Sequence, residues 1–250
     1  MYCDSHCHLD GYEEGQLAAL LENARNKGVE LVVGVGTTLE ASEIATDLSR
    51  RFPNVVPAVG VHPWWAIPLE GEALATLKRL AGLKGVVAIG EVGIDSERYP
   101  DTVDLQWQSF RQEVALAKEM GLPLLLHCKG DRPRVLEYLR SQGATRGVFH
   151  GFTGDSIEAS EWLDLGLYIG IGLRAFTRDP SPVREQAIAS IPLDRILLET
   201  DSSPRSYASE EAMEPARVVD VAQKVARLHG VSAEEVGRRT TANVRAMLGM

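Results

Sequence analysis

The chain repeats one pattern eight times, a short apolar run followed by a segment whose apolar residues recur at helical spacing. Most of the runs are rich in Val, Ile and Leu without polar alternation, which is typical of parallel strands buried on both faces. The predicted strands are residues 2–8, 30–35, 55–61, 86–92, 123–127, 147–150, 167–172 and 195–200. Eight strand–helix units in 250 residues predict a (β/α)8 TIM barrel, one domain over residues 1–250 with its active site at the C-terminal ends of the strands.

Capping signals mark several of the helices between these runs. The residues expected to begin them are Thr37 with Glu40, Asp101, and Ser232 with Glu235. Gly121 is expected to end the helix that Asp101 begins. Two helices are predicted after the last strand, at about 212–228 and 232–247.

An open, doubly wound sheet is the alternative arrangement for such a pattern. In that fold, ligands gather near the one point where the strand order reverses. In this chain, polar residues end at least six different strands, which favours a closed barrel.

Residues that bind metals well lie at the ends of these predicted strands. The set consists of His6, His8, Glu91, His127, His150 and Asp201. A fifth histidine, His62, ends another run, and the sixth, His229, lies outside the set at a helix end. A carboxylate such as Glu91 is costly to bury without a cation. The pattern therefore predicts a metal centre at the mouth of the barrel.

The segment Asp4-Ser-His6-Cys-His8 strengthens this interpretation. Because side chains alternate along a strand, Asp4, His6 and His8 share one face while Cys3 and Cys7 point the other way. Two imidazoles on one face can bind a single ion. Asp4 is expected to hold an imidazole or a neighbouring backbone group.

Imidazole and carboxylate ligands suit Zn²⁺, Mn²⁺, Fe²⁺ or Co²⁺, whereas a site made of oxygens alone would favour Mg²⁺. We predict two divalent cations (Zn, Mg, Mn or similar), with Glu91 bridging them. The first is assigned to His6, His8, Glu91 and Asp201, and the second to Glu91, His127 and His150. Asp201 is expected to orient the attacking water or accept its proton. The predicted catalytic residues are therefore Asp201 and the bridging Glu91.

Bulk composition limits the partners and the location. The net charge of −9 argues against broad nonspecific binding to nucleic acid, although a metal pair can supply local positive charge. The three cysteines are few and odd in number, as expected for unpaired thiols in a reducing compartment. No apolar run approaches the roughly 20 residues that cross a bilayer, and no signal peptide is expected. We expect a cytoplasmic monomer without membrane association.

Several residues on the predicted mouth loops could contact substrate. Lys129, Arg132, Arg174 and Arg178 are candidates for phosphate binding, and solvated loop charge is the alternative. Trp64 and Trp65 could stack on bases or pack against the barrel rim. His62 could contact phosphate, bind a third metal or make a structural hydrogen bond. We assign His62 and Lys129 to substrate binding.

An ordered set of motifs spans almost the whole chain. They are Asp4-Ser-His6-Cys-His8, Gly60-Val-His62-Pro63, Gly90-Glu91-Val-Gly93-Ile-Asp95, Leu126-His127, His150-Gly-Phe-Thr-Gly154, Glu199-Thr-Asp201 and Thr241-Ala-Asn243-Val-Arg-Ala-Met-Leu248. The set resembles the TatD-like metal-dependent hydrolases and deoxyribonucleases of the amidohydrolase superfamily. The resemblance implies a metal-dependent phosphodiesterase of the 3′-to-5′ exonuclease type, acting on single-stranded DNA or 3′ ends. It places metal ligation on the same six residues.

Departures from that family lie beside the predicted ligands. Lys129 stands two residues after His127 where many relatives have arginine, and Ser202-Ser203-Pro204 replaces the usual Ala-Pro. Lysine keeps a charge for phosphate but lacks the bidentate fork of arginine. Substrate identity is therefore less constrained than the metal chemistry. The alternatives are a metal-dependent amide, lactone or ester hydrolase and a metal-bound binding module without catalysis.

Overall fold

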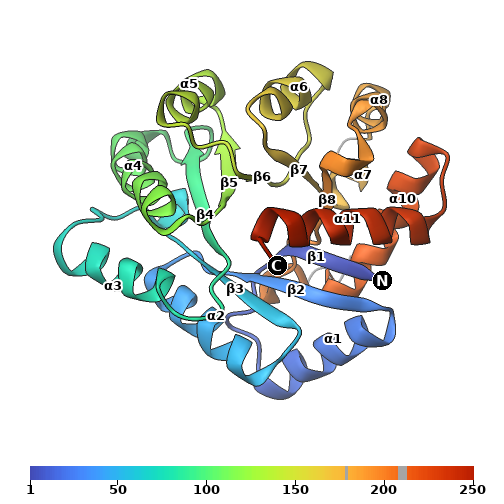
Figure 1. Cartoon of the computed structure of the whole chain (residues 1–250), viewed down its shortest axis with the longest axis horizontal. Coiled ribbons are helices and arrows are strands. Elements are labelled where there is room, and N and C mark those ends of the chain that lie inside the picture. Colours follow the sequence, from blue (N-terminus) through green and yellow to red (C-terminus); the bar gives the residue numbers. More distant parts are fainter. Residues whose placement is uncertain (178–179, 208–212) are drawn as a thin grey trace. The chain divides into compact units, whose positions relative to one another are not determined.

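The computed structural model describes residues 1–177, 180–207 and 213–250. Eight strands form one sheet whose spatial order, β1 to β8, is also their order along the chain, and helices alternate with them (Figure 1). The strands are β1 Tyr2–Cys7, β2 Val29–Val35, β3 Val55–Val59, β4 Ala88–Asp95, β5 Leu124–Lys129, β6 Gly147–Phe149, β7 Tyr168–Ile171 and β8 Ile196–Leu198. Neighbouring strands pair in parallel, as between β4 and β5. The predicted (β/α)8 barrel is confirmed.

The α-helices and 3₁₀ turns follow the strands in sequence. The α-helices are α1 Glu14–Asn26, α2 Leu39–Arg51, α3 Gly71–Ala81, α4 Val103–Met120, α5 Arg132–Gln142, α6 Ser156–Asp164, α7 Arg174–Thr177, α8 Pro182–Ser190, α9 Pro204–Tyr207, α10 Val218–His229 and α11 Ala233–Leu248. The 3₁₀ turns are η1 Pro63–Trp65, η2 Pro100–Thr102, η3 Leu193–Arg195 and η4 Pro215–Arg217. Within the described ranges, none of these helices combines the length and the apolar character that crossing a bilayer requires.

The chain forms two compact units. Unit 1 comprises Met1–Val33, His150–Asp164 and Tyr168–Met250, and unit 2 comprises Gly34–Phe149 and Leu165–Leu167. Each unit holds its own part of the predicted ligand set. The single domain predicted over residues 1–250 stays a prediction.

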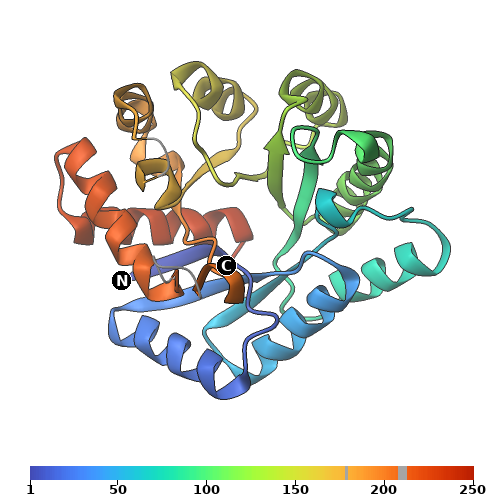
Figure 2. The same cartoon turned by 180° about the vertical axis from the view of Figure 1, so that it is seen from behind.

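In unit 1 the first strand lies beside the end of the last. The Asp201 N–H donates to the His6 carbonyl at 2.9 Å, and the His8 N–H donates to the Ser202 carbonyl at 2.8 Å. Cys7 and Ser202 form a parallel β-bridge between these bonds. Helix α11 packs along β1 and against α10, as both views of the fold show (Figures 1 and 2). The backbone therefore fixes the N-terminal histidines relative to Asp201.

In unit 2 the long helix α4 packs along β4, which pairs with β5. The register of this pair shifts between Ile89 and Val92, so the regular pairing is interrupted at Gly90 and Glu91. Beyond this shift Gly93 lies opposite His127 with φ of +143°, and a Cβ atom at Gly93 would overlap the His127 carbonyl oxygen. Only glycine allows the two strands to approach so closely at this point.

The capping predictions are right for one helix and wrong for two. Ser232 accepts a hydrogen bond from the Glu235 N–H and begins α11 as predicted. The cap of α2 is Thr38, not Thr37, because the helix begins at Leu39 and Thr38 reaches the Ala41 N–H at 3.0 Å.

Asp101 does not cap α4. It lies inside the 3₁₀ turn η2, where its backbone is already helical, and a capping residue needs an extended backbone. Gly121 ends α4 in the left-handed conformation, as predicted. The helix predicted at 212–228 is observed as η4 followed by α10, and residue 212 lies outside the described residues.

Glu113 in α4 is a buried carboxyl group that no sequence motif marked. One of its oxygens accepts from the Val61 N–H at 2.7 Å, and the other is buried without a partner among the described residues. Burial raises the pKa of Glu113 well above its ordinary value, and the hydrogen bond from Val61 offsets only part of this rise. The folded state therefore favours the protonated form.

This burial predicts a pH-dependent stability that the Glu113→Gln variant should lack. Because the pKa of Glu113 is higher in the folded state, the protonated carboxyl stabilises the fold below the unfolded pKa of about 4.3. That contribution is lost as pH rises, by up to about 1.4 kcal/mol for each unit until the folded pKa is reached. Urea denaturation at several pH values should show the unfolding free energy of the wild type falling relative to that of Glu113→Gln. Parallel curves would contradict the prediction.

Candidate metal centre

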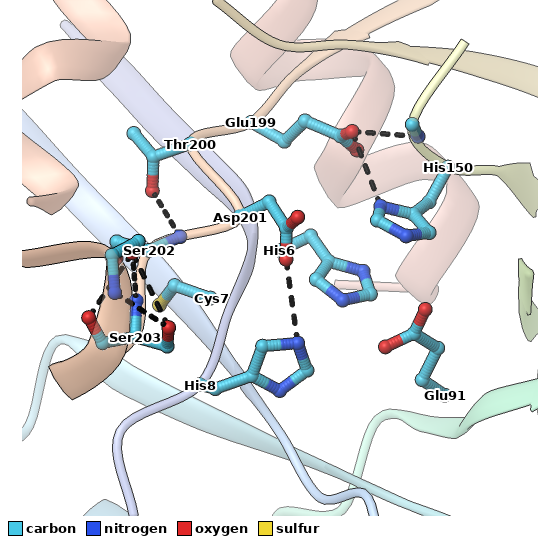
Figure 3. A network of polar contacts seen from close by, with 12 residues as sticks. His6, Cys7, His8, Glu91, His150, Glu199, Thr200, Asp201, Ser202 and Ser203 are labelled. Carbon is cyan, nitrogen blue, oxygen red and sulfur yellow. Dashed lines mark hydrogen bonds and ion pairs between the residues drawn. The ribbon is translucent and has the colours of Figure 1, made fainter. Parts of the chain in front are cut away.

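The Asp201 cluster of unit 1 consists of His6, His8 and Asp201. His8 Nε2 lies 3.4 Å from an Asp201 oxygen, and the rings of His6 and His8 stand edge to face with centroids 5.1 Å apart (Figure 3). One ligand atom from each residue lies within 4.8 Å of the others. The three side chains can therefore hold one ion.

Asp201 sits at a constrained backbone position. Its φ is +51°, the single positive φ of a non-glycine residue in the described part of the chain. The hydrogen bond from its N–H to His6 holds it there. Strained backbone of this kind is concentrated at functional sites. The feature supports a role for Asp201 beyond packing.

The carboxyl group of Asp201 faces positive charge. Burial raises its pKa, but the hydrogen bond from His8 and the charges of His150, Arg174 and His8 outweigh burial and hold the pKa below the usual range. Arg174, an exposed residue at the start of α7, forms an ion pair with the second oxygen of Asp201. Asp201 is therefore an ionised carboxylate at neutral pH.

Asp4 fixes the backbone next to this cluster through hydrogen bonds. It accepts hydrogen bonds from the N–H of Thr200 at 2.9 Å, the hydroxyl of Thr200 at 2.5 Å and the N–H of His6 at 3.3 Å. Burial raises the pKa of Asp4 to about 7, against the opposing effect of these bonds. The prediction that Asp4 holds a neighbouring backbone group is confirmed.

A second group in unit 1 places His150 beside His6. The two rings are stacked with centroids 3.9 Å apart and an angle of 14° between their planes. Glu199 accepts from His150 Nδ1 at 3.2 Å and from the Gly151 N–H at 2.7 Å through the same oxygen (Figure 3). Its other oxygen is buried without a hydrogen-bond partner among the described residues. Glu199 thus orients the ring of His150.

The Glu91 cluster of unit 2 consists of His62, Glu91 and His127. One oxygen of Glu91 lies 3.0 Å from His127 Nδ1 and 3.3 Å from His62 Nε2. His62 Nδ1 accepts from the Trp64 N–H at 3.1 Å, so its hydrogen is on Nε2 and points at Glu91. All three side chains are buried, and their ligand atoms lie within 4.8 Å of one another.

Asp95 contacts the Glu91 cluster through Nε2, the second ring nitrogen of His127. Its Oδ2 lies 3.2 Å from His127 Nε2 and accepts from the indole N–H of Trp64 at 2.5 Å. Burial raises the pKa of Asp95, but the hydrogen bonds from His127, Trp64 and the Arg98 N–H outweigh it and hold the pKa below its ordinary value. Trp64 therefore packs against Asp95, in line with the prediction that one of the two tryptophans packs against the barrel rim. Trp65 is 57% exposed.

The structure groups the predicted ligands as follows. His6, His8 and Asp201 come together, and so do Glu91 and His127, as the two-metal assignment expected. Glu91 and His127 do not end their strands, because β4 and β5 continue to Asp95 and Lys129. The bridging role of Glu91 and the shared site of His127 and His150 stay predictions.

The structure describes His62, Lys129 and Arg174, three of the residues predicted to contact substrate. His62 contacts Glu91, so it belongs to the Glu91 cluster as well as to the predicted substrate side. Lys129 ends β5 opposite Asp95, and its role in substrate binding stays a prediction. Arg174 is paired with Asp201, and Arg178 lies outside the described residues.

Asp95 and Glu199 are two carboxylates for which the sequence motifs predicted no role, although both contact histidines of the predicted ligand set. Each stands within four residues of a predicted ligand in sequence, and each contacts a histidine from another strand. Their position close to a predicted ligand in the sequence was the signal that could have indicated a role. The sequence does not show which histidine each carboxylate contacts.

The donor set fits a divalent transition metal. Imidazoles and carboxylates converge in both clusters, and Glu199 orients one of the imidazoles as the carboxylate partners of metal-bound histidines do. Cys3, Cys7 and Cys128 are buried and form no disulfide. The choice among Zn²⁺, Mn²⁺, Fe²⁺ and Co²⁺ stays a prediction.

Divalent metals should raise the melting temperature of chelator-treated protein. At a free concentration of 100 times Kd, a cation stabilises the fold by about 2.7 kcal/mol. Mn²⁺ or Zn²⁺ should shift the thermal transition upward, and the shift should shrink in His8→Gln. His229→Gln is the matched control, because His229 bonds the Ile188 carbonyl and belongs to neither cluster. No shift with any transition metal would contradict the site.

Comparison with known proteins agrees with this geometry. The family described as TatD related DNase matches residues 3–249. The chain belongs to this family. It is 38% identical to the uncharacterized metal-dependent hydrolase YcfH of Escherichia coli (strain K12), over 96% of this chain and 92% of that protein. It is 34% identical to the 3′-5′ ssDNA/RNA exonuclease TatD of Erwinia tasmaniensis, over 92% of this chain and 93% of that protein.

A solved structure of another TatD relative has the same fold. The crystal structure of YJJV, a TatD homolog from Escherichia coli K12, matches with a TM-score of 0.89 and 25% identity. The match covers 100% of this chain and 98% of that one. The TatD resemblance drawn from the motifs is confirmed.

Proposed function

We propose that this TatD family member is a divalent-metal-dependent hydrolase that cleaves phosphodiester bonds of single-stranded DNA from the 3′ end. The observation that carries the proposal is the grouping of histidines with carboxylates in the Asp201 and Glu91 clusters, in which the charges around Asp201 keep that carboxylate ionised. Membership of the TatD related DNase family and the name of the Erwinia relative support the same reaction.

The proposal retains the ligand set and the two cations predicted from the sequence. The ligands are His6, His8, Glu91, His127, His150 and Asp201, with Glu91 and Asp201 as catalytic residues and His62 and Lys129 on the substrate side. When bound, a divalent cation lowers the pKa of water and polarises a phosphoryl oxygen. Monomeric state and cytoplasmic location belong to the same proposal.

The residues of the Asp201 cluster have distinct tasks in this reaction. Asp201 is ionised, so one of its oxygens can accept a proton from the attacking water. His8 fixes the orientation of that carboxylate from one side and Arg174 from the other. Arg174 is also exposed, and its guanidinium can contact a substrate phosphate.

A strand-labelled nuclease assay tests the proposal. Single-stranded DNA labelled at the 5′ end should shorten stepwise with Mn²⁺, Mg²⁺ or Zn²⁺, whereas the same strand blocked at its 3′ end should persist. RNA of the same sequence measures the preference between the two nucleic acids. A wild type that cleaves neither with any of these metals would overturn the proposal.

The same preparation separates the alternative functions. Turnover of neutral esters, lactones or amides without cleavage of nucleic acid would favour an amide, lactone or ester hydrolase. Tight nucleic-acid binding that the Asp201→Asn variant retains, with no hydrolysis of any substrate, would favour the binding module.

A further inference from the structure

The rim of unit 2 holds Trp65 in a fixed place next to the Glu91 cluster. His62, which contacts Glu91, begins the 3₁₀ turn η1 by accepting from the Trp64 N–H at 3.1 Å. The Trp64 indole in turn donates to Asp95 at 2.5 Å. The Trp65 N–H donates to the His62 carbonyl at 2.8 Å and closes the turn. The backbone of Trp65 is therefore held within one turn of a residue of the cluster.

Trp65 differs from the other tryptophans in how much of it meets solvent. It is 57% exposed, whereas Trp107 and Trp162 are fully buried and Trp64 is partly buried. An indole ring left in water forgoes the stabilisation that burial of a large apolar surface would give. A ring on a fixed backbone that the protein does not cover offers a flat face to a ligand, and nucleic-acid bases stack on such faces.

Arg98 adds a positive charge beside the same turn. Its guanidinium lies 4.3 Å from the centroid of the Trp64 ring and 5.9 Å from that of Tyr99. Its backbone N–H donates to Asp95 at 3.0 Å, so both ends of the residue are held. Arg98 is exposed and forms no ion pair within the described ranges. A guanidinium stacked on a ring keeps its in-plane N–H donors, which match the oxygens of a phosphate.

A second arginine–tryptophan pair of unit 2 shows what distinguishes Arg98. The Arg134 guanidinium lies 4.2 Å from the centroid of the Trp107 ring, but it also pairs with Asp131 at 3.4 Å. Asp131 accepts from the Trp107 indole at 3.0 Å as well. The charge of Arg134 is thus balanced by a carboxylate of the protein, whereas the guanidinium of Arg98 has no such partner among the described residues. Arg134→Gln is therefore a matched control for Arg98→Gln.

We propose that Trp65 and Arg98 form a subsite for a nucleotide of a single strand, in which Trp65 stacks on a base and Arg98 contacts a phosphate. Trp65 follows Trp64 in the chain, and Arg98 stacks on the Trp64 ring. A single strand suits this subsite, because bases paired and stacked in a duplex leave no free face. The subsite rests on the proposed function, since it describes how that substrate is held beside the Glu91 cluster.

Fluorescence anisotropy of a dye-labelled phosphorothioate single strand, with the protein as purified, tests the stacking. Phosphorothioate linkages resist cleavage, so binding is measured apart from hydrolysis. Trp65→Leu should weaken binding about 5- to 100-fold, and Trp65→Phe, which keeps an aromatic face, should restore most of the affinity. A strand of abasic units with the same number of phosphates should bind the wild type and Trp65→Leu equally. Unchanged affinity in Trp65→Leu, or no binding of the normal strand by the wild type, would overturn the subsite.

The same titration at several salt concentrations tests the phosphate contact. Arg98→Gln should weaken binding of the normal and abasic strands alike and reduce the slope of log affinity against log salt by about 0.7. Arg134→Gln should behave as the wild type does. An unchanged slope in Arg98→Gln would exclude the contact with phosphate. A wild type that binds as expected but cleaves nothing in the nuclease assay would support the subsite and overturn the proposed function. Thermal denaturation confirms that each variant is folded.

Discussion

Replacing Asp201 by asparagine is expected to lower kcat for DNA cleavage by about 10³-fold. Asparagine matches aspartate in size and tolerates the left-handed backbone, so the φ of +51° remains accessible. The variant loses the negative charge that faces His8 and Arg174 and the site that accepts a proton. Single-turnover cleavage of 5′-labelled DNA at saturating Mn²⁺ measures the effect.

Asp47→Asn is the matched control for this substitution. Asp47 is an exposed aspartate on α2 whose carboxylate pairs with Arg50, so it carries the same chemical change and belongs to neither cluster. It should retain wild-type kcat. An Asp201→Asn enzyme within threefold of its Asp47→Asn counterpart would exclude Asp201 from the chemical step.

The second large effect is expected at Glu91. Glu91→Gln keeps the volume of the side chain and an acceptor for His62 and His127 but removes the charge that faces them. The variant should bind less metal and lose at least about 10³-fold in kcat/KM, because a buried charge is needed to balance the cation. Elemental analysis of metal per chain after gel filtration, combined with the nuclease assay, measures both quantities.

Glu113→Gln controls for the loss of a buried carboxyl group in the same unit. Glu113 is 1% exposed and Glu91 2%, but the bond of Glu113 is to the backbone of Val61 rather than to an imidazole. Glu113→Gln should keep full metal content and activity. If Glu91→Gln also keeps its metal, Glu91 is not a ligand.

The sequence predicts side-chain placement well where the residues concerned lie on a single strand. The period of two along β1 placed His6 and His8 on one side, and both reach Asp201. Prediction was less accurate for β4, whose pairing with β5 shifts register between Ile89 and Val92 and then continues to Asp95. A run of apolar letters does not reveal such a shift, since the register depends on the neighbouring strand.

The roles of Asp95 and Glu199 could not be predicted, for a related reason. Asp95 meets Trp64, which lies 31 residues away, and Glu199 meets His150, which lies 49 residues away. These contacts depend on how loops from different strands approach one another. Capping was similarly off by one residue at α2, because Thr37 and Thr38 are chemically equal and the helix start decides between them.

The hydrogen bonds between β1 and the segment after β8 have a consequence for protein synthesis. His6 and His8 are translated almost 200 residues before Asp201 and Ser202, whose backbone holds them in place. Chains that stop before residue 200 therefore carry both histidines without the partner strand that fixes them. Products that lack Asp201 and Ser202 should therefore lack hydrolase activity, even though they carry both histidines.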